Sequence, residues 1–265
     1  MMGAIIGDIV GSRFEFHNHR SKDFEFFHKD CEFTDDTVMT LAVAKGILRG
    51  GTLVNGGLLY MGLEMKKLGR MYPNLSYGLR FADWLFSDVF APYGSFGNGS
   101  AMRVSPCAWA AVDEKNCIKV ADVSACFTHD HPEGVKGAEA IAIATYMALH
   151  GSTKDEIRTR MQTYYDIGFT LDQIRASYRF DETCQGTVPQ AIVAFLEADS
   201  FEDAIRNAIS IGGDSDTLAA CTGAIAEAYF GIPQWMRETA RTYLDNTLLE
   251  ILDAFEAKYP PRICA

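Results

Sequence analysis

Apolar residues recur at the three- and four-residue spacing of an amphipathic helix along most of the chain. Glycine or proline stands where this spacing breaks off, as is typical at helix ends. Three segments show the pattern most clearly: 37–49 before Gly50, 133–149 between Pro132 and Gly151, and 216–230 before Gly231. The pattern therefore predicts long helices in both halves of the chain.

Further helices are predicted at residues 188–198 and 201–210, and a leucine-rich helix is predicted at residues 237–257. The period-two alternation of strands is scarce. Many helical positions carry small side chains, which favours close packing in a multi-helix bundle. No repeat, low-complexity tract or linker divides the chain. We therefore expect an all-α fold in one compact domain over residues 1–265.

Two segments do not follow the helical pattern. Residues 12–33 contain six phenylalanines and three histidines among alternating charges, and residues 90–106 are rich in glycine and polar residues. Long irregular stretches within a compact domain are often functional loops. Both segments are therefore candidates for such loops.

Composition and charge narrow the class of protein. Hydrophobic residues make up 48% of the chain and charged residues 22%, which is enough to bury a substantial core. The net charge is −11, and such a surface repels the phosphate backbone of nucleic acids. No basic stripe offsets this charge, so no nucleic-acid partner is expected.

The sequence also predicts neither a membrane segment nor a disulfide framework. The apolar N-terminal run is interrupted by Asp8 and has no basic leader, and no segment reaches the length of a clean membrane span. The seven cysteines are scattered and form no CxxC pair, so a zinc site is not expected. Reduced cysteines in apolar stretches indicate a cytoplasmic protein.

Two acidic clusters open predicted helices. Thr34-Asp35-Asp36-Thr37 precedes the first helix, and Gly212-Gly213-Asp214-Ser215-Asp216-Thr217 precedes the helix at 216–230. Capping explains either cluster alone, with threonine as the N-cap and the acids complementing the helix dipole. The same plan of closely spaced aspartates followed by threonine, repeated much later in the chain, favours a shared function.

If the two clusters meet, four carboxylates and the neighbouring hydroxyls form an all-oxygen site. Hard divalent cations prefer such ligands. Without a cation, the aspartates would repel one another and some would hold protons. Two divalent ions about 3.5–4 Å apart are a recurring catalytic arrangement. The spacing alone does not show that the clusters meet, so this step depends on the fold.

Four blocks, in order along nearly the whole chain, resemble the ADP-ribosylglycohydrolase family. They are GDIVGSRFE at residues 7–15, FTDDT at 33–37, GSFGNGSAMR at 94–103 followed by Thr128-His129, and IGGDSDT at 211–217. Any one block is a weak signal, but four in this order are specific. The family includes the glycohydrolase that reactivates ADP-ribosylated dinitrogenase reductase and the vertebrate ADP-ribosyl hydrolases.

The resemblance implies an all-α fold with two Mg²⁺ ions, or Mn²⁺ in some members, at the base of an ADP-ribose cleft. It implies catalytic roles for Glu15, Asp35 and Asp216. Glu15 matches a glutamate on a mobile loop and could carry a proton during glycosidic cleavage; the alternative is a surface acid on a flexible loop. The metal ligands that the resemblance implies are Thr34, Asp35, Asp36, Asp214, Asp216 and Thr217.

The same resemblance implies that the glycine-rich loop wraps the diphosphate and adenosine, because glycine lets backbone N–H groups approach phosphate oxygens. Phe90 and Phe96 match aromatic positions that flank adenine, although Phe90 is equally explained as core. His129 matches a histidine near the diphosphate or ribose, although a capping or core role also explains it. The implied substrate-binding residues are Phe90, Ser95, Phe96, Gly97, Asn98, Gly99, Met102, His129, Gly213 and Ser215.

We therefore expect a metal-dependent hydrolase that releases ADP-ribose from a modified protein side chain or from a small ADP-ribosyl compound. The alternative is a non-catalytic ADP-ribose-binding protein, or a structural relative like the family members recruited as lens crystallins. Intact metal-ligand blocks favour the enzyme. The sequence leaves open the linkage, the choice between Mg²⁺ and Mn²⁺, and whether the protein is a monomer or a small homo-oligomer.

Overall fold

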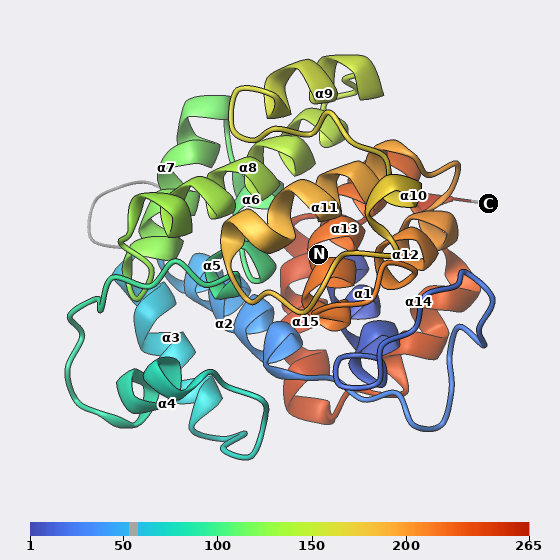
Figure 1. Cartoon of the computed structure of the whole chain (residues 1–265). Helices are drawn as coiled ribbons and strands as arrows, with labels where there is room; N and C mark the ends of the chain where they lie inside the picture. The colour runs from blue at the N-terminus through green and yellow to red at the C-terminus, as the bar shows by residue number, and fades with distance from the viewer. Residues whose placement is uncertain (53–57, 265) are drawn as a thin grey trace.

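The computed structural model describes residues 1–52 and 58–264, and fifteen helices make up most of this part of the chain (Figure 1). Its two strands are two residues long each and pair in parallel, with Ile232 opposite Ile263. The helices share one apolar core, to which nearly every helix contributes buried residues. The predicted all-α fold in a compact domain is confirmed.

The elements have the following order along the chain. In the first half of the chain they are α1 (Met2–Ser12), α2 (Asp35–Gly50), α3 (Leu59–Gly69), α4 (Leu79–Phe86), α5 (Gly99–Met102), α6 (Ser105–Ala110), α7 (Glu114–Cys126) and α8 (Pro132–Leu149). In the second half they are α9 (Lys154–Met161), α10 (Leu171–Ile174), α11 (Cys184–Leu196), α12 (Phe201–Ile209), α13 (Ser215–Phe230), β1 (Ile232–Pro233), α14 (Gln234–Arg241), α15 (Asn246–Lys258) and β2 (Ile263–Cys264).

The clearest predicted helices are confirmed as α2, α8 and α13, each of which starts one or two residues earlier than the apolar pattern indicates. Side-chain caps explain the early starts of the first two. Thr34 accepts a hydrogen bond from the backbone of Asp36, and His131 accepts one from the backbone of Glu133. The pair predicted at 188–198 and 201–210 corresponds to α11 and α12.

The single closing helix predicted at residues 237–257 is wrong, because two helices occupy this region. α14 ends at Arg241 and α15 begins at Asn246. Between them, Asp245 accepts a hydrogen bond from the backbone N–H of Leu248 at 3.0 Å and so starts a new helix. The helical spacing of apolar residues continues across this break and conceals it, at Ala240, Leu244 and Leu248.

The two segments predicted to be irregular behave differently. Residues 13–33 contain no helix or strand and run along the outside of the molecule as the long blue loop of Figure 1. Residues 90–106 are only partly irregular, because α5 and the start of α6 lie within them. The segment at 90–106 thus forms a loop that leads into two short helices.

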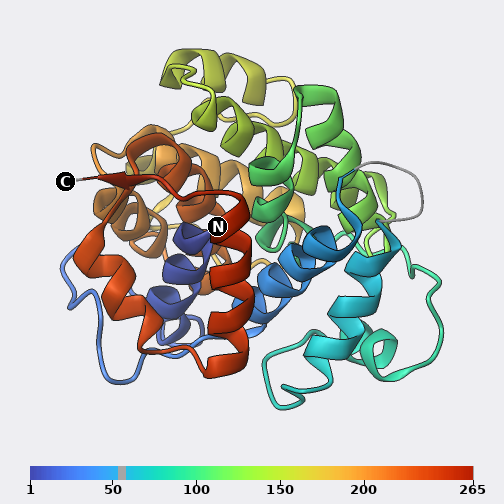
Figure 2. The same cartoon turned by 180° about the vertical axis from the view of Figure 1, so that it is seen from behind.

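At the centre of the fold, α1 packs directly against α13 (Figures 1 and 2). Gly3, Gly7 and Gly11 recur every fourth residue and so share one face of α1. A Cβ atom on Gly7 would lie 2.1 Å from the carbonyl oxygen of Ala219, and one on Gly11 would lie 2.5 Å from the Cα of Asp216. The missing side chains let the two backbones touch, which brings the end of α1 to the start of α13.

The apolar N-terminal run is therefore a core helix, since residues 2–11 are all buried. Within residues 1–52 and 58–264, no helix combines the length and the hydropathy needed to cross a bilayer.

Candidate functional site

The start of α2 is fixed by Asp8, a fully buried residue of α1. Its carboxylate accepts hydrogen bonds from the backbone N–H and the hydroxyl of Thr34, at 2.9 and 2.7 Å, and from the backbone N–H of Thr37 at 3.0 Å. The Thr37 hydroxyl donates to the same carboxylate. Burial raises the pKa of Asp8 to about 6, although these hydrogen bonds oppose the shift. Asp8 thereby sets the positions of the two aspartates that follow Thr34.

The two acidic clusters meet in the fold. The hydroxyl of Thr217, at the start of α13, donates a hydrogen bond to Oδ2 of Asp36 at 3.2 Å. Gly212 and Gly213 just before α13 have φ angles of +71° and +83°, a backbone conformation that favours glycine. This turn directs Asp214 and Asp216 towards α2. The sequence spacing left open whether the two clusters meet, and the packing of α1, α2 and α13 brings them together.

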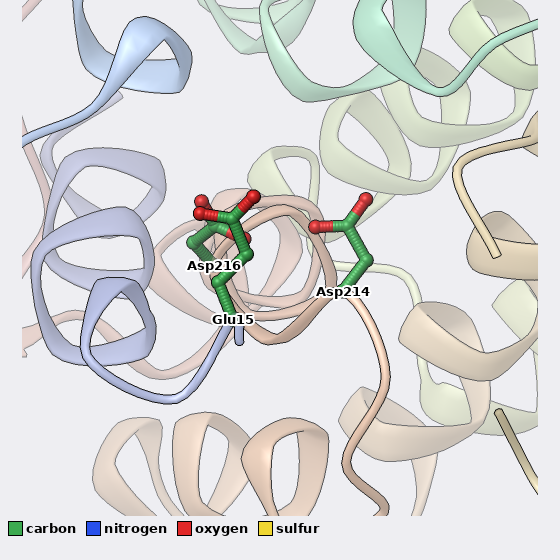
Figure 3. A group of neighbouring side chains, drawn as sticks. All are labelled: Glu15, Asp214 and Asp216. Atoms are coloured by element: carbon green, nitrogen blue, oxygen red, sulfur yellow. The ribbon is translucent and has the colours of Figure 1, made fainter. Parts of the chain in front are cut away.

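A third carboxylate joins the aspartates of α13 from the loop that follows α1 (Figure 3). Glu15, Asp214 and Asp216 each offer an oxygen, and these oxygens all lie within 4.8 Å of one another. Figure 3 shows the three carboxyl groups pointing to the same side of the α13 start. The arrangement can hold a metal ion.

Crowded, buried carboxylates hold protons more tightly than isolated ones. Burial, followed by repulsion from Asp8, Asp35 and Asp214, raises the pKa of Asp36 well above its usual value. Burial and its neighbours likewise raise the pKa of Asp216 well above its usual value.

The pKa values of Asp35 and Glu15 are raised as well. Burial, followed by repulsion from Asp8, raises the pKa of Asp35 to about 7. Burial, followed by repulsion from Asp214 and Asp35, raises the pKa of Glu15 to about 8. A positive ion among these groups would favour their ionised forms.

The donor set fits a hard divalent cation. Oδ1 of Asp36 and Oδ1 of Asp216 are buried and have no hydrogen-bond partner in the described part of the chain. Buried polar atoms are normally paired, so two such orphans side by side call for a positive ligand. The candidate ligand atoms here are carboxylate and hydroxyl oxygens, which favours magnesium- or manganese-type ions over zinc.

These carboxylates line a cavity of about 570 Å³, a volume typical of sites for small organic ligands. The cavity brings together most of the predicted site residues. Those that line it are Glu15, Asp35, Asp36, Ser95, Phe96, Gly97, Asn98, Gly99, Met102, His129, Asp214, Asp216 and Thr217.

Four predicted residues do not line this cavity: Thr34, Phe90, Gly213 and Ser215. The Thr34 hydroxyl serves as a cap and as a donor to Asp8. Ser215 is fully buried, and its hydroxyl donates to the carbonyl of Gly213 at 3.3 Å.

Phe90 lies elsewhere, against the side chains of Trp84 and Lys66. Its ring centroid is 6.2 Å from that of Trp84, and the ammonium group of Lys66 lies 5.1 Å from the Phe90 ring. Phe90 is exposed on its other side, so it is not a core residue, but it does not line the cavity.

The glycine-rich loop is tied to the carboxylate cluster through Asn98. The side-chain amide of Asn98 donates to Oδ2 of Asp214 at 2.7 Å and to the hydroxyl of Thr187 at 3.0 Å. The loop amides of Gly97 and Asn98 are already engaged, by the Ser95 hydroxyl and by a carbonyl oxygen. Asn98 therefore couples the position of the loop to that of Asp214.

Several cavity residues carry no signal in the sequence. Tyr77 lines the cavity with a buried hydroxyl that has no partner among the described residues. Phe180 lines it too, and its ring lies 6.4 Å from that of Phe16 on the Glu15 loop. Both lie outside any motif, so only the fold identifies them. Asp8, in contrast, lies within the first of the four sequence blocks, and that position could have marked it as a site residue.

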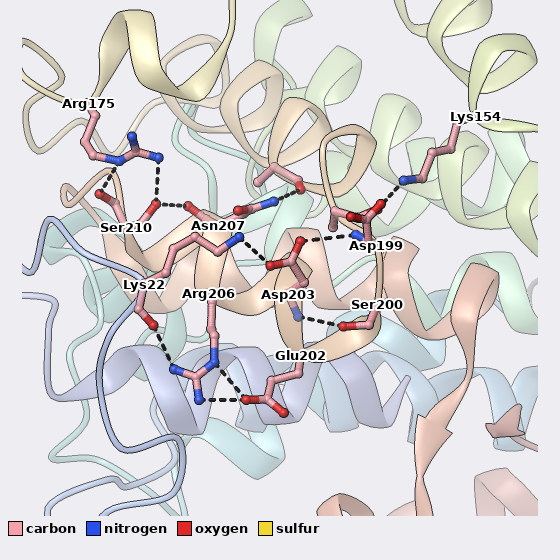
Figure 4. Close-up of polar contacts among 12 residues, drawn as sticks. Lys22, Lys154, Arg175, Asp199, Ser200, Glu202, Asp203, Arg206, Asn207 and Ser210 are labelled. Atoms are coloured by element: carbon pink, nitrogen blue, oxygen red, sulfur yellow. Dashed lines mark hydrogen bonds and ion pairs between the residues drawn. The ribbon is translucent and has the colours of Figure 1, made fainter. Parts of the chain in front are cut away.

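The loop that carries Glu15 is anchored on α12 (Figure 4). The guanidinium of Arg206 donates to the backbone carbonyls of Lys22 and Phe24, each at 2.8 Å, and lies 4.8 Å from the Phe24 ring. Lys22 forms an ion pair with Asp203 of the same helix. These contacts hold the far half of the loop and leave Glu15 on the part that faces the cavity.

A second anchor holds the loop beside α13. The Asn18 side chain accepts a hydrogen bond from the backbone N–H of Gly213 at 2.7 Å. Arg20 donates to the carbonyls of Tyr178 and Ile211, at 2.7 and 3.1 Å. The turn before Asp214 is thus in direct contact with the Glu15 loop.

Comparisons with known proteins point to one family. A family model described as ADP-ribosylglycohydrolase matches residues 1–261. The chain is 26% identical to human ADP-ribosylhydrolase ARH3 over 330 residues, which cover 94% of this chain and 90% of the relative. It is 27% identical over 287 residues to ADP-ribosylarginine hydrolase Tri1 of Pseudomonas putida (strain GB-1). This match covers 91% of the chain and 73% of the relative.

A solved structure of an ADP-ribosylglycohydrolase-related protein complex has the same fold, with a TM-score of 0.73. The two chains are 22% identical, and the match covers 97% of this chain and 94% of the other. The fold, the converging carboxylates and a family match that spans almost every residue lead to one conclusion. The chain belongs to the ADP-ribosylglycohydrolase family.

Proposed function

We propose that this protein is a metal-dependent hydrolase that cleaves the glycosidic bond between ADP-ribose and a protein side chain or a small ADP-ribosyl compound. One observation carries the proposal: carboxylates from opposite ends of the chain converge in a cavity of about 570 Å³. The names of the relatives, an ADP-ribosylhydrolase and an ADP-ribosylarginine hydrolase, support the same substrate class.

The proposal assigns two divalent ions, Mg²⁺ or Mn²⁺, to the oxygens of the two acidic clusters. The buried orphan oxygens of Asp36 and Asp216 and the raised pKa values of both carboxyls support it. Bound ions would stabilise negative charge and orient hydroxyl groups of the ribose that carries the scissile bond. The ligands proposed are Thr34, Asp35, Asp36, Asp214, Asp216 and Thr217.

Glu15 is the proposed proton carrier. It is only partly buried, it faces the aspartates, and its pKa is raised to about 8 by burial and by their charge. Bound cations would offset part of this shift, and a carboxyl group close to its ordinary pKa can still give up and accept a proton during glycosidic cleavage. Asp35 and Asp216 would instead remain ionised beside the cations and hold the site together.

The rest of the cavity is proposed to bind ADP-ribose. Phe96 is 43% exposed, which leaves its ring free to stack on a base. Asn98 links the loop to Asp214, so ligand contact at the loop and the state of the carboxylate cluster are coupled. The linkage that is cut depends on residues near Glu15, where the leaving group would depart.

A release assay tests the proposal. The protein is incubated with arginine-linked, serine-linked and O-acetyl ADP-ribose, in magnesium, in manganese or in a chelator, and free ADP-ribose is measured. Release that requires a divalent ion is expected for at least one linkage. Metal-independent release would refute the proposed centre. Tight ADP-ribose binding without release from any substrate would instead favour the non-catalytic alternative.

A further inference from the structure

A buried guanidinium lies against the wall of the cavity. Arg103 is fully buried, yet no carboxylate forms an ion pair with it in residues 1–52 and 58–264. Its Nη2 donates to the carbonyl of Ser124 and to the hydroxyl of Thr128, both at 2.9 Å, while Nε and Nη1 have no partner there. A buried unpaired charge is costly, so it calls for a role.

The hydroxyl of Thr128 is held in one direction by this contact. Thr128 is fully buried, and its oxygen accepts a hydrogen bond from Arg103 and lies 2.7 Å from Nδ1 of His129. A hydroxyl has one proton to donate. If the imidazole donated to it instead, that proton would have no acceptor among the described residues. The assignment that satisfies every group has Thr128 donating to Nδ1 of His129.

This direction fixes the tautomer of His129. With Nδ1 as an acceptor, the ring proton resides on Nε2. Nε2 lies under the glycine-rich loop, since a Cβ atom on Gly99 would be 3.2 Å from it and one on Gly97 would be 3.5 Å from it. Within the described residues no acceptor is bonded to Nε2. Burial, followed by the charge of Arg103, lowers the pKa of His129 well below its usual value, so the ring is neutral.

We propose that Arg103 and Thr128 are positioning residues that hold His129 as a neutral imidazole whose Nε2–H donates to a phosphate oxygen of the ligand in the cavity. The inference rests on the proposed function for its ligand. One feature of this wall favours a phosphate: the positive charge of Arg103 lies close behind the imidazole. The loop amides of Gly97 and Asn98 are already engaged, so the Nε2–H of His129 is a donor that stays available here. Hydrogen bonds from neighbouring residues fix the tautomer of metal-binding histidines in the same way.

The test begins with the unliganded protein. Nitrogen-15 NMR spectra that correlate ring nitrogens with ring protons distinguish a protonated nitrogen from an unprotonated one. His129→Gln removes the signals of this ring and so assigns them among the six histidines. We expect Nε2 protonated and Nδ1 unprotonated in the wild type, unchanged across neutral pH. A protonated Nδ1 would overturn the proposal.

Variants of Thr128 test whether the hydroxyl sets the tautomer. Thr128→Val removes the hydroxyl at nearly constant shape, and Thr128→Ser keeps it. Thr145→Val is the matched control, because the Thr145 hydroxyl is equally buried but donates to a carbonyl within α8. We expect mixed tautomers in Thr128→Val, and the wild-type spectrum in Thr128→Ser and Thr145→Val. If Thr128→Val does not fold, the wild-type and serine spectra still decide the tautomer.

Binding and turnover in magnesium supply the functional readout. In Thr128→Val, ADP-ribose affinity is expected to fall roughly five- to tenfold, the net contribution of one hydrogen bond. KM should rise by a similar factor while kcat stays within about twofold, because the phosphate contact is present before and during bond cleavage. Wild-type affinity in Thr128→Val would overturn the positioning role. Failure of the wild type to bind or hydrolyse any ADP-ribosyl compound would instead refute the proposed function.

Discussion

Glu15 and the aspartates lie side by side but differ in how firmly they are held. Asp36 is a buried residue of the first turn of α2, where hydrogen bonds to Asp8 fix the neighbouring threonines. Glu15 is only partly buried and lies on an irregular segment outside any helix, although Asn18 and Arg20 anchor that segment nearby. The aspartates are thus suited to hold ions, and Glu15 is suited to move and exchange a proton.

Glu15→Gln tests this difference. The substitution keeps size and hydrogen bonding, but the amide cannot accept and return a proton as a carboxyl group does. Turnover at saturating magnesium should therefore fall by roughly 10²–10⁴-fold. ADP-ribose affinity, measured by calorimetry, should change little because the phosphate and base contacts lie elsewhere in the cavity. Glu25→Gln, at an exposed carboxylate of the same loop, is the control. Near-normal turnover in Glu15→Gln would show that another group carries the proton.

Asp36→Asn should separate stability from metal binding. The amide relieves the repulsion within the cluster, so without divalent ions the free energy of unfolding should rise by about 0.5–2 kcal/mol. The same change removes a carboxylate oxygen that has no other partner, so divalent-ion affinity should fall. Denaturant unfolding in chelator and titration with magnesium measure the two effects. A variant destabilised in chelator and unchanged in magnesium affinity would contradict the assignment.

At the scale of elements, the glycine face of α1 determines where the aspartates can meet. Gly7→Ala would place a Cβ atom 2.1 Å from a backbone carbonyl of α13, which cannot move aside as a side chain can. We expect the free energy of unfolding to fall by about 1–3 kcal/mol or more, as in other overpacked cores. Magnesium affinity should fall with it, because displacing α1 moves Asp8 away from Thr34 and Thr37.

Gly78→Ala is the control for this substitution. Nothing lies within 4 Å of a Cβ atom at Gly78, and its φ is not positive. Its free energy of unfolding should stay within about 0.5 kcal/mol of the wild type. Equal stability of Gly7→Ala and Gly78→Ala, measured by denaturant unfolding, would show that the α1–α13 contact is looser than described.

Sequence patterns predicted the helices well where caps and glycine stops are strong, as in α2 and α13. They did not reveal the break before α15, because Asp245 lies within a helical spacing of apolar residues that continues on both sides. They identified the two acidic clusters but not that these meet, since contact depends on packing between distant helices. Tyr77 and Phe180 could not have been predicted from the sequence. They lie in no motif, and only the fold brings their rings to the cavity wall.

For the whole molecule, the clustered carboxylates link stability to pH. Burial and neighbouring charges raise the pKa of Glu15 to about 8 and of Asp35 to about 7, whereas in an unfolded chain both titrate near pH 4. Below about pH 4 both states hold these protons, and the contribution to stability is fully present. As the pH rises towards about 8, the unfolded state releases its protons first, so the free energy of unfolding falls.

The expected result is a Tm that falls in chelator between about pH 5 and 8, and a stabilisation by magnesium that grows over the same range. Protons and metal ions compete for the same oxygens, which is the physical reason for the growth. Thermal unfolding of the wild type and of Asp36→Asn across this range checks the prediction. The Tm of Asp36→Asn should depend less steeply on pH. A magnesium effect of equal size at both ends of the range would contradict the linkage.

The α1–α13 contact also has a consequence for biosynthesis. A ribosome makes α1 roughly 200 residues before the helix against which its glycine face packs, a delay on the order of 10–40 s at typical elongation rates. During that interval the glycine face of α1 has no native partner and depends on chaperones or transient contacts for shielding. Asp8 can already fix the start of α2, but Asp214 and Asp216 are added only by the late event. The growing polypeptide therefore lacks the complete acidic cluster until its last fifth emerges, and a chain cut short before α13 holds only the α2 half of it.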